Sequence, residues 1–309
     1  MSWLQLAAEL DEFLEGAGAG SRLGEQLATA GTLIALPATI VALGAFLFMV
    51  FIHDGNNAEV KAIWRLETVC GALLIVGGLV GMYGAILVLG SGWSSELLGG
   101  TARGATLRVV GGTGIVLGFA GRKVPDRTQL RGRVLVGVLG IVLGAAAGAS
   151  TGHTITEGNL LLHVAMNVTH LTAGAIWVGG LLSLAVIMRM RSRDPDANPM
   201  APQVVHFSGV ATLAIMAVAA AGFGMSLTIV DGPWDYLRTS WGRLLVVKVA
   251  LVGVAVGIGA YNHFVVVPAL ETDAADPVYL PRARSTITAE VVILIAVAAL
   301  TVFLTGAKT

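Results

Sequence analysis

The composition of this 309-residue chain excludes most classes of soluble protein. Hydrophobic residues make up 55% of it and charged residues only 12%, whereas soluble domains carry roughly 25% charged residues. The 19 basic residues are balanced by 19 acidic ones, which excludes the concentrated positive face of a nucleic-acid-binding protein. A single cysteine excludes a disulfide framework and any multi-cysteine metal cage. The composition therefore predicts an all-α, polytopic membrane protein.

Eight stretches are apolar and long enough to approach the length of about 20 residues that crosses a bilayer. In chain order they are residues 31–52, 69–90, 105–121, 134–151, 159–188, 205–230, 243–268 and 287–305. The sequence therefore predicts a bundle of about eight transmembrane helices, with an outer N-terminal segment and two four-span halves. These three parts are residues 1–30, 31–151 and 152–309. The first part is not a typical secretory signal, and we expect an amphipathic helix on the outer interface or a disordered tail.

Basic residues are distributed unequally between the two sides of this bundle. The connections after the first, third, fifth and seventh spans contain twelve: Lys61, Arg65, Arg122, Lys123, Arg127, Arg131, Arg133, Arg189, Arg191, Arg193, Arg282 and Arg284. The opposite side contains four: Arg22, Arg103, Arg238 and Lys308. Because loops rich in Lys and Arg stay in the cytoplasm, we expect both chain ends outside and a multi-pass location in the cytoplasmic (inner) membrane.

Glycines recur at four-residue spacing within several of the predicted spans. They include Gly77 with Gly81, Gly114 with Gly118, Gly140 with Gly144, and Gly253 with Gly257. Small residues at this interval allow helix backbones to approach closely in lipid. The pattern predicts a compact bundle.

The fifth span carries a polar stripe on one helical face. At about 100° per residue, six of its residues fall within roughly 100° of arc. They are His163, Met166, Asn167, His170, Gly174 and Trp177. Polar side chains on a lipid-embedded helix must face protein or a cavity, because lipid cannot satisfy them. We therefore expect this stripe to face the bundle interior.

Two imidazoles and a thioether on one face are typical of a soft-metal site. These donors suit copper, and sulfur favours Cu(I), whereas harder ions prefer carboxylates. His163 and His170 lie about 10 Å apart along the helix axis, so they indicate successive stations or two separate sites. His153, in a short outer loop, is a candidate ligand at the entrance. We predict that His153, His163, Met166 and His170 bind metal; the alternative is that they are interhelical hydrogen-bonding and packing residues.

Other ionisable residues favour structural roles. His53, His206 and His263 lie level with each other at the predicted cytoplasmic ends of spans, where a shared site is conceivable but a histidine needs no special function. Lys248 is expected to extend to the outer interface. Glu290 is expected in the first turn of the last span, where the helix dipole favours a carboxylate. We find no nucleotide-binding loop, metalloprotease motif or nucleophile elbow, and expect no enzymatic activity.

An ordered set of residues over about 150–305 resembles the copper resistance D family of membrane proteins. The set comprises Thr151-Gly152-His153, His163, His170, Trp177-Val178-Gly179-Gly180-Leu181, Phe207-Ser208, Thr239 to Leu245 with Lys248, Asn262-His263 with Pro268, and Glu290. The resemblance implies an eight-span inner-membrane protein that handles copper and moves it across the membrane. The fold is also similar to that of di-haem membrane cytochromes.

Three functional hypotheses follow. The first is a membrane protein that binds copper at its outer face and imports it along the stripe, in contact with an outer copper-binding protein. The second is a haem b cytochrome or metal reductase, which requires paired histidines from facing helices at one depth. His163 and His170 have no obvious histidine partner on another span, so this ranks second. The third is a membrane partner that loads copper into another protein without transporting it.

Overall fold

The computed structural model describes residues 3–89, 103–121, 127–149, 160–193, 200–227, 232, 234–273 and 278–306. Side chains are described from residue 22 onward with a few exceptions, among them His163. The described residues form helices and contain no strand. The helices are α1 (Trp3–Phe51), α2 (Asn57–Leu89), α4 (Arg103–Phe119), α5 (Arg127–Ala149), α6 (Leu160–Arg191), α7 (Ala201–Leu227), α8 (Asp235–Arg238), α9 (Ser240–Tyr261), α10 (Val267–Thr272) and α11 (Tyr279–Gly306).

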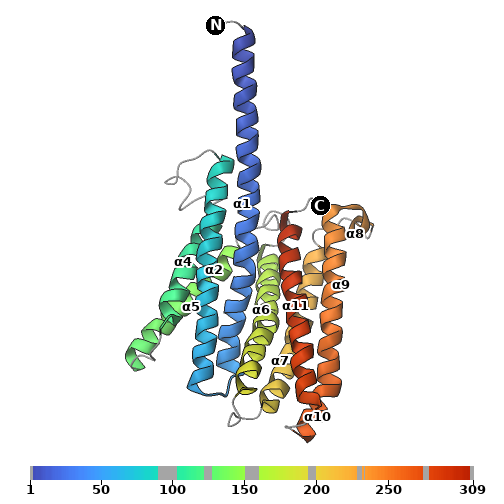
Figure 1. Ribbon diagram of the computed structural model, residues 1–309. Helices are drawn as coiled ribbons and strands as arrows, with labels where there is room; N and C mark the ends of the chain where they lie inside the picture. The colour runs from blue at the N-terminus through green and yellow to red at the C-terminus, as the bar shows by residue number, and fades with distance from the viewer. Residues whose placement is uncertain are drawn as a thin grey trace.

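The prediction of an all-α, polytopic membrane bundle is confirmed. A helix lies at each of the eight predicted positions, and six helices within the described ranges are long and apolar enough to span a bilayer. These six segments are Arg22–Phe51, Asn57–Val88, Val164–Arg191, Ala201–Leu227, Ser240–Thr272 and Tyr279–Leu304. Figure 1 shows both chain ends toward the same end of the bundle, as an even number of crossings requires. The count of eight and the outward orientation of the ends stay predictions.

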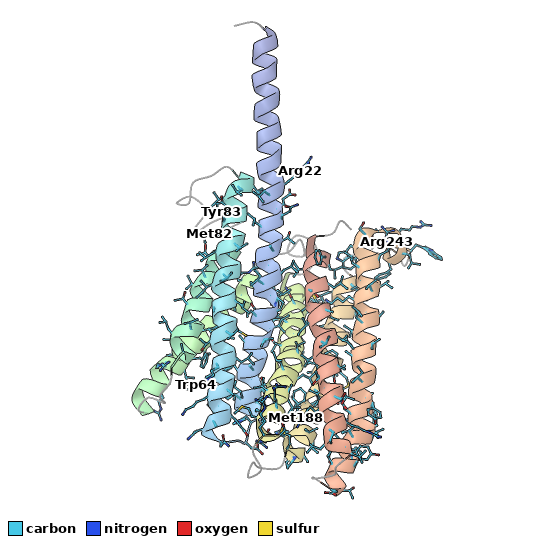
Figure 2. All side chains as sticks on the ribbon, in the orientation of Figure 1. Arg22, Trp64, Met82, Tyr83, Met188 and Arg243 are labelled. Carbon is cyan, nitrogen blue, oxygen red and sulfur yellow. The ribbon has the colours of Figure 1, made fainter. Side chains whose placement is uncertain are left out.

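The helices form two neighbouring groups that meet at α1 and α6 (Figure 1). In the first group α2 packs against α1 and α4, and α4 packs against α5. In the second group α6 contacts α7 and α11, and α9 packs against α11. Each group has an apolar cluster of its own, with Trp64, Leu74 and Phe119 in the first, and Trp177 and Leu184 in the second. Figure 2 places Arg22 and Arg243 toward the end of the bundle that holds the chain ends, and Met188 toward the other.

The N-terminal segment differs from both expectations. It is neither a separate interfacial helix nor a disordered tail, because α1 runs without interruption for 49 residues. Such a helix is about 74 Å long, more than twice the hydrocarbon thickness of roughly 30 Å. Figure 1 accordingly shows its first part extending beyond the other helices. Hydropathy marks only the apolar part of a helix, so it could not show this continuity.

Because hydropathy marks only the apolar part of a helix, it also placed the starts of α2 and α11 too late. They start at Asn57 and Tyr279, so the basic residues assigned to two connections lie in the first helical turns instead. Asn56 fixes the start of α2, because its Oδ1 accepts hydrogen bonds from the backbone N–H groups of Ala58 at 2.9 Å and Glu59 at 3.1 Å. Such a side-chain cap satisfies donors that the first turn of a helix leaves unpaired.

Close glycine packing is confirmed for most of the predicted pairs. A Cβ atom added to Gly31 in α1 would lie 2.5 Å from the carbonyl oxygen of Gly77 and 2.6 Å from the nitrogen of Gly81 in α2. Gly140 of α5 meets α4 just as closely, at 2.5 Å from the carbonyl oxygen of Gly111. Only glycine permits these backbone contacts. The prediction is wrong for one pair: Gly253 and Gly257 of α9 have nothing within 4 Å of an added Cβ in the described part of the chain.

Candidate functional site

The predicted ligands fall on α6 and on the segment before it. His153 lies outside the described residues, and His163 lies in the first turn of α6 with its side chain outside them. Met166 and His170 are both described, and both are half-buried. The structure therefore shows the surroundings of two of the four residues.

His170 is held by the neighbouring helix α7. Its Nδ1 lies 3.0 Å from the backbone carbonyl oxygen of Val218. Because a carbonyl can only accept, Nδ1 carries the proton and Nε2 keeps its lone pair in the neutral ring. Within the described residues Nε2 has no hydrogen-bond partner. Metal-binding histidines show this arrangement, with one nitrogen oriented by a carbonyl and the other directed at the metal.

Glycines of α7 provide the space for both side chains. A Cβ atom added to Gly222 would lie 3.1 Å from Cε1 and 3.2 Å from Nδ1 of His170. One added to Gly224 would lie 2.6 Å from Sδ of Met166. The thioether and the imidazole thus both face α7, one turn apart and about 6 Å along the axis of α6. The predicted stripe therefore faces protein at these two positions.

Lys248 of α9 adds a cationic group near this site. It lies close enough to His170 for the two side chains to interact electrostatically. The sequence led us to expect only that Lys248 extends to the interface, and it did not predict this electrostatic interaction with His170. A positive charge beside the imidazole weakens the binding of any cation, and divalent ions are repelled twice as strongly as monovalent ones.

Trp177, further along the stripe, points to a different helix. Its Nε1 donates a buried hydrogen bond of 2.8 Å to Oε1 of Glu290 in α11. The carboxyl group also lies close to Gly259 of α9, 3.4 Å from an added Cβ. The expectation that Glu290 occupies a first helical turn is wrong. Since α11 begins at Tyr279, Glu290 lies about 16 Å from that start, too far for an effect of the helix terminus.

A π-helical segment, Asn262–Val266, follows α9 and holds a second polar group. There the backbone N–H of Val267 donates to the carbonyl of Asn262, five residues back instead of four. His263 Nδ1 and Ser208 Oγ of α7 are hydrogen-bonded at 2.8 Å. Thr286 of α11 donates to Asn262 Oδ1 at 2.6 Å. Single π-helical turns widen a helix locally and occur often at functional sites.

The three histidines at the other end of the bundle have separate surroundings. His53 pairs with Glu59, His263 bonds Ser208, and the exposed His206 borders a pocket lined by apolar residues such as Phe48 and Phe51. Among the described residues, no group of three or more His, Cys, Asp or Glu side chains forms a metal site. We therefore assign no shared site to these histidines.

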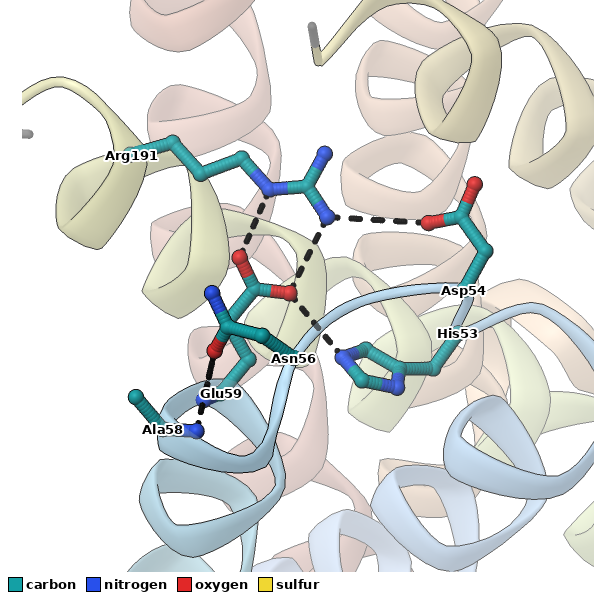
Figure 3. A network of polar contacts seen from close by, with 6 residues as sticks. All are labelled: His53, Asp54, Asn56, Ala58, Glu59 and Arg191. Atoms are coloured by element: carbon teal, nitrogen blue, oxygen red, sulfur yellow. Dashed lines mark hydrogen bonds and ion pairs between the residues drawn. The ribbon is translucent and has the colours of Figure 1, made fainter. Parts of the chain in front are cut away.

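A buried ionic network joins α2 to the end of α6 (Figure 3). Arg191 donates from Nε to Oε1 of Glu59 at 2.7 Å and from a terminal nitrogen to Oε2 at 3.0 Å. His53 Nε2 lies 3.0 Å from the same Oε2, and Asp54 lies 3.6 Å from Arg191. The sequence did not predict this network, because Glu59 and Arg191 are 132 residues apart. The acidic residues Asp54 and Glu59, which follow His53 in the chain, were the only indication of an ionic network there.

The fold and these buried polar pairs define a polytopic helical membrane protein. The model of the family described as Copper resistance protein D matches residues 201–304, from α7 to α11. The "Inner membrane protein YebZ" of Escherichia coli is 32% identical over 124 residues, which cover 40% of this chain and 42% of that protein. The "Copper resistance protein D" of Pseudomonas syringae is 26% identical over 164 residues, 52% of this chain and 53% of that protein.

A third relative, the "Copper transport protein CutJ" of Bacillus subtilis, is 28% identical over 113 residues, 37% of this chain and 21% of that protein. The chain thus matches about half or less of the length of these relatives. No solved structure matches. The expected resemblance to the copper resistance D family is confirmed over residues 201–304 and by these partial relatives of this membrane protein.

Proposed function

We propose that this protein binds copper within the membrane and imports it across the cytoplasmic membrane. In this proposal Met166 and His170 bind the ion between α6 and α7. His153 and His163 deliver it from the outer face. The observation that carries the proposal is the orientation of His170, whose Nδ1 bonds the Val218 carbonyl and whose Nε2 lacks a partner among the described residues. Two relatives bear names that refer to copper resistance or copper transport.

The chemistry of the two side chains favours the cuprous ion. A thioether is a soft donor that prefers Cu(I), and neither side chain offers the carboxylate oxygens that harder ions prefer. Lys248 supports the same choice, because its charge repels a monovalent ion less than a divalent one. Met166 and His170 are one helical turn apart, so both can reach one ion. His163, about 10 Å above His170, then acts as an earlier station.

The described residues do not favour the haem alternative. Haem b ligation requires a second histidine at the same depth on a facing helix. On α7, which faces His170 at Val218, the histidine is His206, about 18 Å away along the helix axis. Thus the described part of the chain offers His170 no such partner.

The decisive experiment compares copper binding by wild-type protein with the variants His170→Ala and Met166→Leu. His206→Ala is the matched control, because it removes an exposed imidazole from the same bundle. Purified proteins are titrated with Cu(I) against a chromogenic Cu(I) chelator. We expect His170→Ala to abolish stoichiometric binding, Met166→Leu to weaken it, and His206→Ala to leave it unchanged. Undiminished binding by a folded His170→Ala/Met166→Leu double variant would refute the site.

Two further measurements separate import from the other functions. Copper accumulation in cells, and uptake into vesicles that contain the purified protein, should both fall in the His170→Ala variant. Binding without flux in vesicles would instead indicate a protein that loads copper into an outer copper-binding partner. A Soret band with stoichiometric haem in the purified protein would identify the cytochrome.

A further inference from the structure

Glu67, in the N-terminal helix group, is the most deeply buried carboxyl group that the copper site does not use. It lies in α2 and is 0% exposed. Neither of its oxygens has a hydrogen-bond partner among the described residues. One turn earlier on the same helix, the indole Nε1 of Trp64 is likewise buried and without a partner there. Trp64 is labelled on α2 in Figure 2, and its ring packs against that of Phe119 in α4, with the ring centroids 5.9 Å apart.

The two other buried glutamates of the described chain have partners. Glu59 receives two hydrogen bonds from Arg191, and Glu290 receives one from Trp177. Glu67 is also the most fully buried of the three, at 0% exposed against 3% for Glu59 and 2% for Glu290. It lies ten residues, about 15 Å, after the start of α2 and just before the apolar stretch 69–90. An ionisable group buried between membrane helices without a partner is costly, and such groups usually serve a function.

Among the described side chains, no charged group of the surrounding helices forms a hydrogen bond with Glu67. On α1, no charged residue occurs between Glu25 and the end of the helix at Phe51. On α4, the Arg108 guanidinium donates to Thr32 Oγ1 at 3.1 Å and lies 4.0 Å from a Cβ added to Gly81, about 21 Å along α2 from Glu67. On α2 itself the buried thiol of Cys70 interacts electrostatically with Glu67, whereas Arg65, two residues earlier, is exposed on the surface of the helix.

On the neighbouring helices α6 and α5, Arg191 and Arg133 are bonded to groups other than Glu67. On α6, Arg191 is bound to Glu59, and no lysine, arginine or acid occurs between Leu160 and Arg189. On α5, Arg133 bonds the backbone carbonyl of Ala120, beyond the end of α4. A carboxylate in such surroundings would lose its hydration without gaining a donor or a counter-charge, whereas the neutral acid avoids that cost.

We propose that Glu67 is a proton-binding site within the membrane. Its carboxylate takes up one proton to form the neutral carboxylic acid and releases the proton again when the N-terminal helices admit water. Only a proton and the carboxylate take part. The site lies outside residues 201–304, which match the family. The proposal does not depend on copper binding.

Infrared spectroscopy tests the site, because a neutral carboxylic acid has a carbonyl stretch that a carboxylate lacks. The sample is the full-length protein in lipid vesicles at neutral pH, compared with its Glu67→Gln variant. We expect a carbonyl band in the wild-type protein that disappears in Glu67→Gln and remains in the control Glu290→Gln. Identical bands in wild-type protein and Glu67→Gln would overturn the proposal.

A second measurement needs no variant and applies even if Glu67→Gln does not fold. Dicyclohexylcarbodiimide modifies protonated carboxyl groups in apolar surroundings. After treatment of the wild-type protein in vesicles, peptide mass spectrometry should find severalfold more adduct on Glu67 than on Glu59, which Arg191 keeps ionised. Adduct on Glu67 no greater than on Glu59 would overturn the proposal.

Discussion

The contact between Arg191 and Glu59 should contribute strongly to stability, and replacing Arg191 with methionine tests this. Methionine keeps much of the length of the side chain but removes the two donors at 2.7 and 3.0 Å. Among the described side chains, the buried carboxylate of Glu59 then keeps only His53 as a partner. Removing one member of a buried ion pair costs about 3–5 kcal/mol. Because His53 compensates in part, we expect the lower limit, about 3 kcal/mol.

The assay is equilibrium unfolding of purified protein in mixed micelles, followed by circular dichroism. A double-mutant cycle with Glu59→Gln and Arg191→Met should give a coupling energy of about 2 kcal/mol, as expected for hydrogen bonds between charged groups. Asp54→Asn is the matched control, since Asp54 contacts the same Arg191 at 3.6 Å but has a side chain that is 63% exposed. It should cost less than about 0.5 kcal/mol. The reasoning would be refuted if the effects of Glu59→Gln and Arg191→Met on the free energy of unfolding were additive. It would also be refuted if Asp54→Asn cost as much as Arg191→Met.

Two further predictions concern the second helix group. Trp177→Phe should lower the free energy of unfolding by about 2 kcal/mol, because it leaves Glu290 without its hydrogen-bond donor. Glu290→Gln keeps an acceptor for the indole N–H and should cost less. Equal losses for the two variants in the same unfolding assay would contradict this prediction. Gly222→Val should displace the imidazole of His170 and weaken Cu(I) binding severalfold. Gly209→Val, on the same helix with open space around it, should not, and equal chelator titrations would count against the site.

The sequence predicted the membrane-spanning parts well because lipid imposes one strong rule on them. Apolar stretches of sufficient length must be helical, and six of the eight predicted positions satisfy that rule in the described structure. The helix ends were less predictable. The starts of α2 and α11 contain charged residues such as Lys61 and Arg282, so the apolar stretch begins after the helix does. The spacing of Gly77 and Gly81 predicted close packing correctly, whereas Gly253 and Gly257, at the same spacing on α9, face no described atom within 4 Å of an added Cβ.

For the candidate site, the sequence predicted which residues share one face of a helix but not which helix that face contacts. Helical periodicity placed Met166 and His170 on one face, but it could not show that this face meets the glycines of α7. Nor could it show that Trp177 turns to Glu290, because the register between α6 and α11 depends on packing and not on local sequence. The π-helical segment was also missed, since Pro268 indicates a break but not the extra residue that precedes it.

The polar contacts of the second helix group constrain how an ion would move inward from His170. The next groups along the path that could bind an ion already form hydrogen bonds. Glu290 accepts one from Trp177, and His263 is hydrogen-bonded to Ser208. Each bond engages one atom of its group, Oε1 of Glu290 and Nδ1 of His263, and orients the other atom, as the Val218 carbonyl does for His170. An ion moving inward from His170 would therefore meet an oriented carboxyl oxygen on α11 and an oriented imidazole nitrogen on the π-helical segment, where the hydrogen-bond pattern of the helix changes.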